Sequence, residues 1–362
     1  MGSIHSTTHN NLIVIYHNAS KMTGTHNAFF PIFGFLKILT LLGVWTMKIF
    51  LTYASNPQTT AFYLEKAMRE LSDVITYGPT ISEETLKKWD LMAIAEKVKA
   101  HQIPLTDGDI INALKLVPSG WAPDVLLFID TGFFFPLINI STVNCIKACY
   151  MIDSHINFKR HLDFVKSFDV VFTGHKPAVE MFKEEGFNDV FWIPPACDPE
   201  IHGKKGEEKW YDISFVGSLN ANFNPERVHL LNELKQRFHV HYERCFLERM
   251  AEVFSQSKIV FNKSIMNGLN MRVFEVLASG SMLLTDESKE SGLTELFQEQ
   301  RDLVIYRTED ELFELAYHYL KYGEEREKIA EAGRKKVLKE HTYHHRARDI
   351  VEVLSTIKKK KP

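Results

Sequence analysis

The sequence predicts an α/β protein made of two doubly wound, Rossmann-like domains that face each other across a cleft. Short apolar runs typical of buried parallel strands alternate with helical patterns along most of the chain. Between residues 194 and 209 this alternation is interrupted by Pro-Pro and Asp-Pro pairs and by the charged run G-K-K-G-E-E-K, which indicates an interdomain linker. We therefore expect domains at 47–205 and 206–340, followed by a last helix and a basic tail at 341–362.

The first domain is expected to contain six strands and five helices. The strands are continuous apolar runs, as parallel strands covered on both faces usually are. They are predicted at Ile49–Tyr53, Val74–Tyr77, Val125–Ile129, Ile146–Ile152, Val170–Thr173 and Val190–Ile193. The helices are predicted at Thr60–Leu71, Glu83–Ala100, Asp109–Val117, Ile156–Phe168 and Pro177–Glu185.

The second domain repeats this alternation and ends in three helices. Its strands are predicted at Ile213–Val216, Ile259–Phe261, Ser281–Thr285 and Leu303–Tyr306. Its helices are predicted at Pro225–Arg237, Glu248–Ser255, Asn270–Ser279, Glu309–Tyr322, Glu324–Glu340 and Tyr343–Ile357. Gly280 is well placed to end the third of these helices, because glycine readily adopts the left-handed conformation of a helix C-terminus.

The net charge and the cysteine content limit the kinds of binding partner and the cellular compartment that the sequence predicts. The net charge is −3, with no basic field that would suggest nucleic acid. The lysine run Lys358–Lys361 is interpreted as a solvated end. The four cysteines contain no CxxC pair and fit a reducing, cytoplasmic setting in which each thiol is a small buried group.

The first 46 residues differ from the rest of the chain. Residues 28–45 form an apolar run close to the roughly 20 residues that span a bilayer. This leaves a signal anchor or a peripheral membrane contact open, although Lys37 and the helix-breaking residues around it argue against a spanning helix. The run M-K-I-F-L-T-Y from Met47 is a good first buried strand. We therefore expect the fold to start at Met47, with residues 1–46 as an upstream extension or a poorly ordered segment.

Glu275 is the most unusual residue of the second domain, because it lies between Phe274 and Val276 on an otherwise apolar helix. A buried carboxylate costs several kcal/mol, roughly, unless it is paired. One interpretation is an i,i+3 ion pair with Arg272 on an exposed face. The other is a ligand diol, since the two carboxylate oxygens can each accept a hydrogen bond from adjacent ribose hydroxyls.

The loop before this helix favours the ligand. Gly268 and Asn270 are expected to present unpaired backbone N–H groups at a helix start, where phosphate groups commonly bind. Gly217 and Ser218 follow a predicted strand and should form a tight turn that faces the cleft. Arg272 is interpreted either as the nearest cation for a diphosphate or as a solvated helix residue.

These residues carry a resemblance to a known family. The segment G-L-N-M-R-V-F-E-V-L-A-S-G from Gly268, followed by a strand and T-D-E, resembles the donor-binding segment of two-domain glycosyltransferases of the GT-B fold. It is most similar to the CgeB-like (spore-maturation, spore-coat) family. Further stretches resemble the same family in order: D-S-H at Asp153, I-P-P-A-C-D-P-E-I-H at Ile193, Y-D-I-S-F-V-G-S-L at Tyr211, A-G-R at Ala332 and H-T-Y at His341.

The resemblance covers roughly residues 47 to 355 and implies transfer of a sugar from a nucleotide-sugar donor. It also implies a last helix that crosses back to the first domain, and an acceptor that is a surface polymer, a spore component or a protein. Many retaining enzymes of this fold carry two glutamates eight positions apart; here Glu275 fills the second position and Asn267 stands in the first. The resemblance therefore implies donor binding by residues 267–270, including Leu269, but leaves retention or inversion of configuration open.

Two further classes of function stay open beside the transferase. Because Asn267 replaces a glutamate, a non-catalytic nucleotide-sugar-binding module is the first alternative. A nucleotide-sugar epimerase of the same fold is the second. No metal or other cofactor is expected, because backbone N–H groups, a helix dipole and cationic side chains can neutralise the leaving diphosphate.

Two aspartate motifs in the first domain have competing interpretations. In Asp107-Gly108-Asp109 a metal-binding pair is less well supported than a turn followed by a helix cap. Asp153 and His155 directly follow a strand, at the cleft edge. His155 is a candidate general base for an acceptor hydroxyl, oriented by Asp153, and the alternative is a helix cap followed by a surface histidine.

The predicted start of the fold is directly testable. Deletion of residues 1–46 should leave a protein that stays in solution with an unchanged melting temperature, because the first core strand begins after that segment. Thermal melts of the full and shortened chains check this. Loss of folding, or membrane association that depends on residues 28–45, would overturn it.

Overall fold

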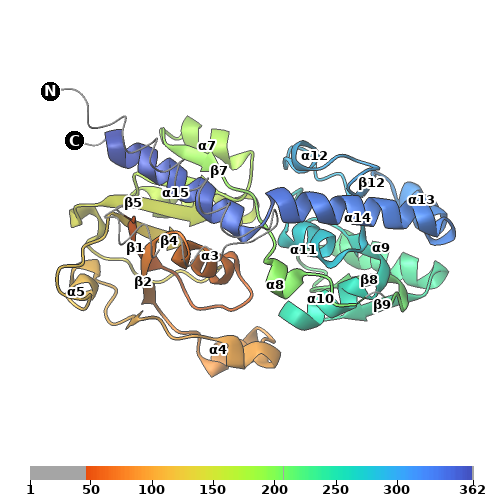
Figure 1. The fold of residues 1–362 in the computed structure, drawn as a ribbon, viewed down its shortest axis with the longest axis horizontal. Helices are drawn as coiled ribbons and strands as arrows, with labels where there is room; N and C mark the ends of the chain where they lie inside the picture. The colour runs from red at the N-terminus through yellow and green to blue at the C-terminus, as the bar shows by residue number, and fades with distance from the viewer. Residues whose placement is uncertain (1–45, 207, 361–362) are drawn as a thin grey trace, which may run out of the picture. The chain divides into compact units, whose positions relative to one another are not determined.

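The computed structural model describes residues 46–206 and 208–360, and these residues form two parallel β-sheets with helices packed on their faces (Figure 1). The predicted fold class is therefore confirmed. The predicted N-terminal extension lies outside the described residues, apart from Thr46. Among the helices that the structure describes, none has the length and apolar character that a membrane span requires.

The first sheet has seven strands in the order β3-β2-β1-β4-β5-β6-β7. They are β1 (Lys48–Thr52), β2 (Asp73–Gly78), β3 (Ile103–Pro104), β4 (Val125–Ile129), β5 (Ile146–Met151), β6 (Val170–Thr173) and β7 (Val190–Trp192). The helices of this half are α3 (Thr60–Arg69), α4 (Glu83–Lys88), α5 (Ile110–Leu114), α6 (Ser154–Val165) and α7 (Ala178–Glu184), with 3-10 turns η1 (Met92–Lys97) and η2 (Ile140–Thr142). Every residue of the central strand β4 is buried, as its continuous apolar run predicts.

The second sheet has five strands in the order β12-β11-β10-β8-β9. They are β8 (Tyr211–Val216), β9 (Val240–Glu243), β10 (Ser257–Asn262), β11 (Met282–Asp286) and β12 (Val304–Tyr306). The helices are α8 (Pro199–His202), α9 (Pro225–Arg237), α10 (Leu247–Ser255), α11 (Met271–Ser279), α12 (Leu293–Leu296), α13 (Glu309–Lys321), α14 (Gly323–Glu340) and α15 (Tyr343–Lys360).

The strand order of the second sheet reverses between β8 and β10. The chain runs from β8 to its outer neighbour β9, and from β10 in the opposite direction to β11. In doubly wound sheets ligands bind at the carboxyl ends of the strands where this reversal occurs. The loops that follow β8 and β10 begin at Gly217 and Lys263, so the predicted donor-binding residues lie at the switch point.

The final helix crosses to the first sheet, as expected. α15 packs against α3 (Figure 1), and its residues Ala347, Ile350 and Leu354 belong to the hydrophobic core of the first sheet. At its start Tyr343 stacks on Tyr63 of α3, with ring centroids 5.0 Å apart. The last segment of the chain therefore helps to hold the first domain together.

Several elements differ from the prediction. The expected helix Glu83–Ala100 is wrong: α4 ends at Lys88, and Asp90 adopts a left-handed conformation with φ of 58° before η1 begins. The break lets Leu86, Leu91 and Ile94 all be buried, which one straight helix would not achieve. Four short elements, β3, α8, β9 and α12, were not expected from the sequence, and α8 lies in the segment predicted as a linker. The three helices predicted at the end of the chain are confirmed as α13, α14 and α15. Gly280 ends α11 with φ of 75°.

Candidate functional site

Glu275 lies on the second turn of α11 and is only 7% exposed. Within residues 46–206 and 208–360 no hydrogen bond to its carboxylate is formed, and the expected surface pair with Arg272 is absent. The nearest polar partner is His202 of α8, whose Nε2 lies 3.8 Å from Glu275 Oε1. The carboxylate is therefore buried with most of its hydrogen-bonding capacity unused.

His202 has a closer hydrogen-bond partner in the Tyr63 hydroxyl, which lies 3.3 Å from its Nε2. Its Nδ1 accepts a hydrogen bond of 2.9 Å from the backbone N–H of Asp198, so in the neutral imidazole the proton is on Nε2. Burial lowers the pKa of His202 to about 4 and keeps the ring neutral at pH 7. Burial also raises the pKa of Glu275 to about 7, while the positive charge of Arg272 opposes that rise.

Arg272 is neither a solvated residue nor part of a surface pair. Its Nε donates to the carbonyl of Val216 at 2.9 Å, and its Nη1 donates to Asn262 Oδ1 at 2.8 Å. The guanidinium lies over the ring of Phe215, 4.7 Å from its centroid. Burial lowers the pKa of Arg272 to about 9, with Arg227 adding to the shift and Glu275 opposing it, so the group remains a cation at pH 7.

Gly217 forms the turn expected after β8. Its φ is 144°, and a Cβ at this position would overlap Arg272 Nη2, so only glycine fits between the strand end and the guanidinium. Ser218 is exposed, and its carbonyl accepts a 3.4 Å bond from Arg227 Nη1. The turn therefore brings the backbone close to a buried cation at the switch point.

The N-terminus of α11 lacks a side-chain cap. Asn270 is at the N-cap position, but its amide donates to Asn262 Oδ1 at 3.2 Å instead of accepting a bond from the helix. In the first turn the N–H of Val273 donates to the carbonyl of Asn270 at 3.3 Å, and the N–H groups of Met271 and Arg272 are thus left for an anion. The expected bare N–H of Gly268 is wrong, because it donates to the carbonyl of Ile265 at 2.8 Å.

The other two residues predicted to bind the donor, Leu269 and Asn267, lie apart from the N-terminus of α11. Leu269 is buried and packs in the core formed with α10 and α12. Asn267 is exposed in a left-handed conformation and lines a hollow of about 320 Å³ beside the loop. The rest of this hollow comes from α9 and from the loops after β10, β11 and β12: Glu226, His229, Leu230, Lys263, Asp286, Glu287, Ser288, Lys289, Tyr306, Arg307, Thr308 and Glu309.

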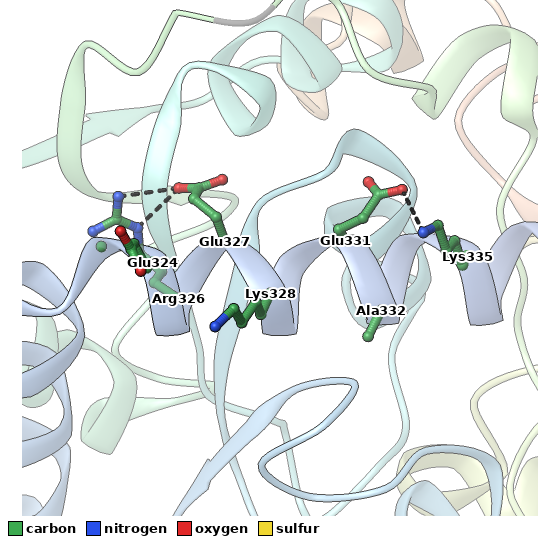
Figure 2. A pocket seen from close by; sticks show the side chains of 8 residues that line it. Glu324, Arg326, Glu327, Lys328, Glu331, Ala332 and Lys335 are labelled. Carbon is green, nitrogen blue, oxygen red and sulfur yellow. Dashed lines mark hydrogen bonds and ion pairs between the residues drawn. The ribbon is translucent and has the colours of Figure 1, made fainter.

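A larger hollow of about 730 Å³ lies along α14 and is unrelated to the strand ends. Figure 2 shows its lining, in which charged side chains of this one helix project from successive turns. Lys335 pairs with Glu331 at 3.5 Å, and Arg326 with Glu327 at 3.0 Å. Since one charged helix face supplies the whole lining, we assign no chemistry to this hollow.

In the first domain Asp153 and His155 lie at the carboxyl end of β5. Asp153 is at the N-cap position of α6, but neither a capping bond nor a bond to His155 is formed within the described residues. The surrounding protein and the Asp130 carboxylate raise the pKa of Asp153, and His161 opposes the rise; because the side chain is exposed, solvent weakens the shift. The expected orientation of His155 by Asp153 is therefore not seen.

Asp130, at the end of β4, instead faces His161. The distance from Asp130 Oδ2 to His161 Nε2 is 3.2 Å, and His161 Nδ1 lies 3.0 Å from Ser154 Oγ. This resembles a nucleophile–histidine–aspartate arrangement, but Ser154 has no exposed surface. The three side chains therefore fix the first turn of α6, which carries His155.

His155 packs against the loop that precedes α11. A Cβ on Gly268 would overlap His155 Nε2, so the imidazole packs directly on this glycine. On its other side His155 faces His175, with ring centroids 5.1 Å apart. Burial lowers the pKa of His155 to about 4, with His175 and His161 adding to the shift. A neutral imidazole at this position can accept a proton at pH 7.

The aspartate pair near α5 is a turn and a cap, as predicted. Asp107 Oδ1 accepts a bond from the N–H of Asp109, and Asp109 Oδ1 accepts one from the N–H of Ile111 at the start of α5. Among residues 46–206 and 208–360 no three His, Cys, Asp or Glu side chains gather as metal ligands would.

Five residues of the site were not identified from the sequence: His202, Asn262, Arg227, Asp130 and His175. Asn262 and Asp130 can be recognised in the sequence, since each is the polar residue at the carboxyl end of a buried strand. His175 follows β6 at the same edge. Arg227 carries no such signal, because its donation to the Lys263 carbonyl at 2.6 Å depends on how α9 packs against the next loop.

Comparison with known proteins gives a family match for the C-terminal part of the chain and structural matches for the fold. Residues 207–352 match the model of a family described as glycosyl transferase-like. No curated protein matches the chain. Among solved structures, HepE of Anabaena in complex with UDP-glucose aligns with a TM-score of 0.60 and 11% identity, over 86% of this chain and 100% of that chain.

Two other solved structures align over similar lengths. An alpha-glucosyltransferase in complex with UDP and a 13-mer DNA has a TM-score of 0.59 and 14% identity, over 86% of this chain and 100% of that one. A putative UDP-N-acetylglucosamine 2-epimerase from Listeria monocytogenes has a TM-score of 0.52 and 14% identity, over 85% and 95%. The chain thus has the GT-B fold, and its residues 207–352 are similar to the glycosyl transferase-like family.

Proposed function

We propose that the protein is a glycosyltransferase that moves a sugar from a nucleotide-sugar donor to an acceptor. The observation that carries this proposal is Glu275, a buried carboxylate whose oxygens accept no hydrogen bond in the described part of the chain. A ribose diol supplies two donors with matching spacing. Glu275 follows the helix start at Met271 by four residues, which is about 6 Å along the axis, and this suits a ribose attached to a phosphate bound at the helix N-terminus.

The diphosphate of the donor is proposed to bind at the uncapped N-terminus of α11. Arg272 contributes a buried positive charge, and its Nη2 points to Gly217, where the chain has no side chain. In this low-dielectric position a fixed guanidinium and helix N–H groups stabilise a leaving diphosphate more strongly than they would in water. Transfer without a metal is part of this proposal.

The acceptor is proposed to bind on the first-domain side, next to His155. The imidazole contacts the donor loop at Gly268 and is neutral at pH 7, so it can take the proton of an attacking hydroxyl. We further propose that the chain is a CgeB-like transferase that acts in the cytoplasm on a surface polymer, a spore component or a protein. The resemblance of the segment from Gly268 to Gly280 supports this assignment.

Two other functions have specific support. Asn267 stands where many retaining enzymes carry a glutamate, which favours a non-catalytic nucleotide-sugar-binding module. The likeness to a putative 2-epimerase structure supports interconversion of a free nucleotide sugar on the same fold. All three functions use the donor site at Glu275, so they differ only in what happens to the bound sugar.

A panel of labelled nucleotide sugars, beginning with UDP-glucose, separates the three functions. For the transferase we expect release of nucleoside diphosphate, with transfer to water when no acceptor is present, and less release from Glu275→Gln. Release is measured by chromatography of the nucleotide products. Binding without any release would support the module, and interconversion of the sugar while it stays attached would support the epimerase.

Glu275→Gln should weaken donor binding through lost contacts to the ribose. The change keeps the shape but removes the charge from two hydrogen bonds, so we expect UDP affinity to fall by about 1.5–3 kcal/mol, more than tenfold. Calorimetry with UDP and 2′-deoxy-UDP measures this. The wild type should discriminate between the two ligands and the variant much less, whereas Glu252→Gln on neighbouring α10, a half-exposed position, should behave as the wild type. Equal binding of both ligands by the wild type would sink the assignment.

The same residue should lower the stability of the unliganded protein at high pH. Burial raises the Glu275 pKa to about 7, so the folded state binds a proton more tightly than the unfolded state. The free energy of unfolding therefore falls as pH rises from the ordinary value near 4.5 to about 7. At pH 8 Glu275→Gln should be more stable than the wild type by up to about 3 kcal/mol, and at pH 4 nearly equal to it.

Urea unfolding at both pH values measures this difference. Glu252→Gln again provides the control, since its carboxylate pairs with Arg249 at the surface and should give no such pH-dependent gain. A Glu275→Gln protein that is less stable than the wild type at pH 8 would show that the carboxylate has a structural partner.

A further inference from the structure

His155 and His175 form a pair at the carboxyl edge of the first sheet. They follow β5 and β6, which are neighbouring strands, so their side chains emerge side by side. Their ring centroids are 5.1 Å apart and their planes are inclined by 46°. His175 is only 9% exposed. The site described above uses His155 alone, and His175 has no function assigned to it there.

The Nδ1 atoms of both rings are enclosed by protein and have no hydrogen-bond partner in the described residues. A buried unpaired nitrogen costs about 1–3 kcal/mol, so two of them in adjacent rings need an explanation. With ring centroids 5.1 Å apart, the two Nδ1 atoms reach hydrogen-bonding distance when both imidazoles turn these atoms toward each other. One Nδ1–H would then donate to the lone pair of the other Nδ1 and satisfy both.

The backbone holds these two rings in place. The N–H of His175 donates to Thr173 Oγ1 at 3.2 Å, and Thr173 Oγ1 donates to Ser154 Oγ at 3.2 Å, directly before His155 in the chain. Ser154 is bonded in turn to His161, which faces Asp130. The residues that carry the two imidazoles are therefore tied to one buried network.

Electrostatics decide which ring donates. His155 Nε2 lies against Gly268, three residues before the uncapped start of α11 at Met271. A lone pair on Nε2 is favoured there over an N–H, because the helix N-terminus is positive. His155 must then carry its proton on Nδ1. The remaining charged groups are engaged elsewhere: Lys176 pairs with Glu295, and Asp153 is exposed and forms no bond to His155.

We propose that His175 accepts the Nδ1–H of His155, fixes its tautomer, and shares its charge during proton transfer from an acceptor hydroxyl. This inference rests on the proposed function for the identity of the acceptor group. As the acceptor oxygen bonds to the anomeric carbon, the bond from that carbon to the diphosphate breaks and its electron pair leaves with the diphosphate. The hydroxyl proton moves to His155 Nε2, the Nδ1 proton shifts toward His175 Nδ1, and water removes one proton after product release.

The tautomer of His155 can be measured without any activity. Long-range proton–nitrogen correlation spectra distinguish Nδ1–H from Nε2–H imidazoles, and the peak lost in His155→Gln identifies the residue. We expect wild-type His155 as Nδ1–H and a change to Nε2–H in His175→Phe, which fills the space without a nitrogen. The control His318→Phe, at an exposed position on α13, should change nothing. An Nε2–H tautomer in the wild type, or no change in His175→Phe, would overturn the proposal.

Turnover supplies the second arm, measured as UDP release from UDP-glucose. His175→Phe should lower turnover at least about tenfold with UDP affinity unchanged, and His155→Ala roughly a hundredfold or more. Because the two rings act together, the double variant should be no slower than His155→Ala. Additive losses, or a joint fall of UDP affinity and melting temperature, would indicate packing instead. A wild type that binds UDP without turnover would contradict the transferase, while the spectra would still decide the pair.

Discussion

The structure depends on one constraint, the burial of the Glu275 carboxylate where α11 packs against α8. Its neighbours on α11 at that level are apolar, and His202 Nε2, which bonds with the Tyr63 hydroxyl at 3.3 Å, stays 3.8 Å from the carboxylate. A carboxylate in this position is costly in the empty protein and becomes favourable only when hydroxyl groups reach it. The unsatisfied carboxylate therefore destabilises the empty protein, and binding of the proposed donor would remove this cost.

The surrounding residues follow from this constraint. Arg272 could neutralise Glu275 three residues away, but it is turned back to Val216 and Asn262, so its charge is held at the switch point of the second sheet. Gly217 leaves room above that charge. Arg272 is thus both the cation that could pair with Glu275 and the cation that, under the proposed function, binds the diphosphate. Pre-organised charge of this kind stabilises a leaving diphosphate, which the proposed sugar transfer requires.

The sequence predicted the framework well and the site partly. Long apolar runs such as Val125–Ile129 and amphipathic helices such as Pro225–Arg237 are local signals, and they fixed the α/β class and the order of elements. The break after Lys88 was missed, because it depends on which side chains the core can accept. Within the site, the burial of Glu275 was readable from its neighbours. The partners of Arg272 and His155 were not, since Val216, Asn262 and His175 approach them only through tertiary packing.

The most direct test of the account is the protonation of Glu275 itself, followed by carbon NMR of the carboxyl group as pH is varied, with and without UDP. Burial without a partner predicts a pKa near 7 in the free protein, and binding of UDP should lower it strongly because ribose hydroxyls donate to the ionised form. A Glu275 pKa near the ordinary value in the free protein, unchanged by UDP, would contradict the account.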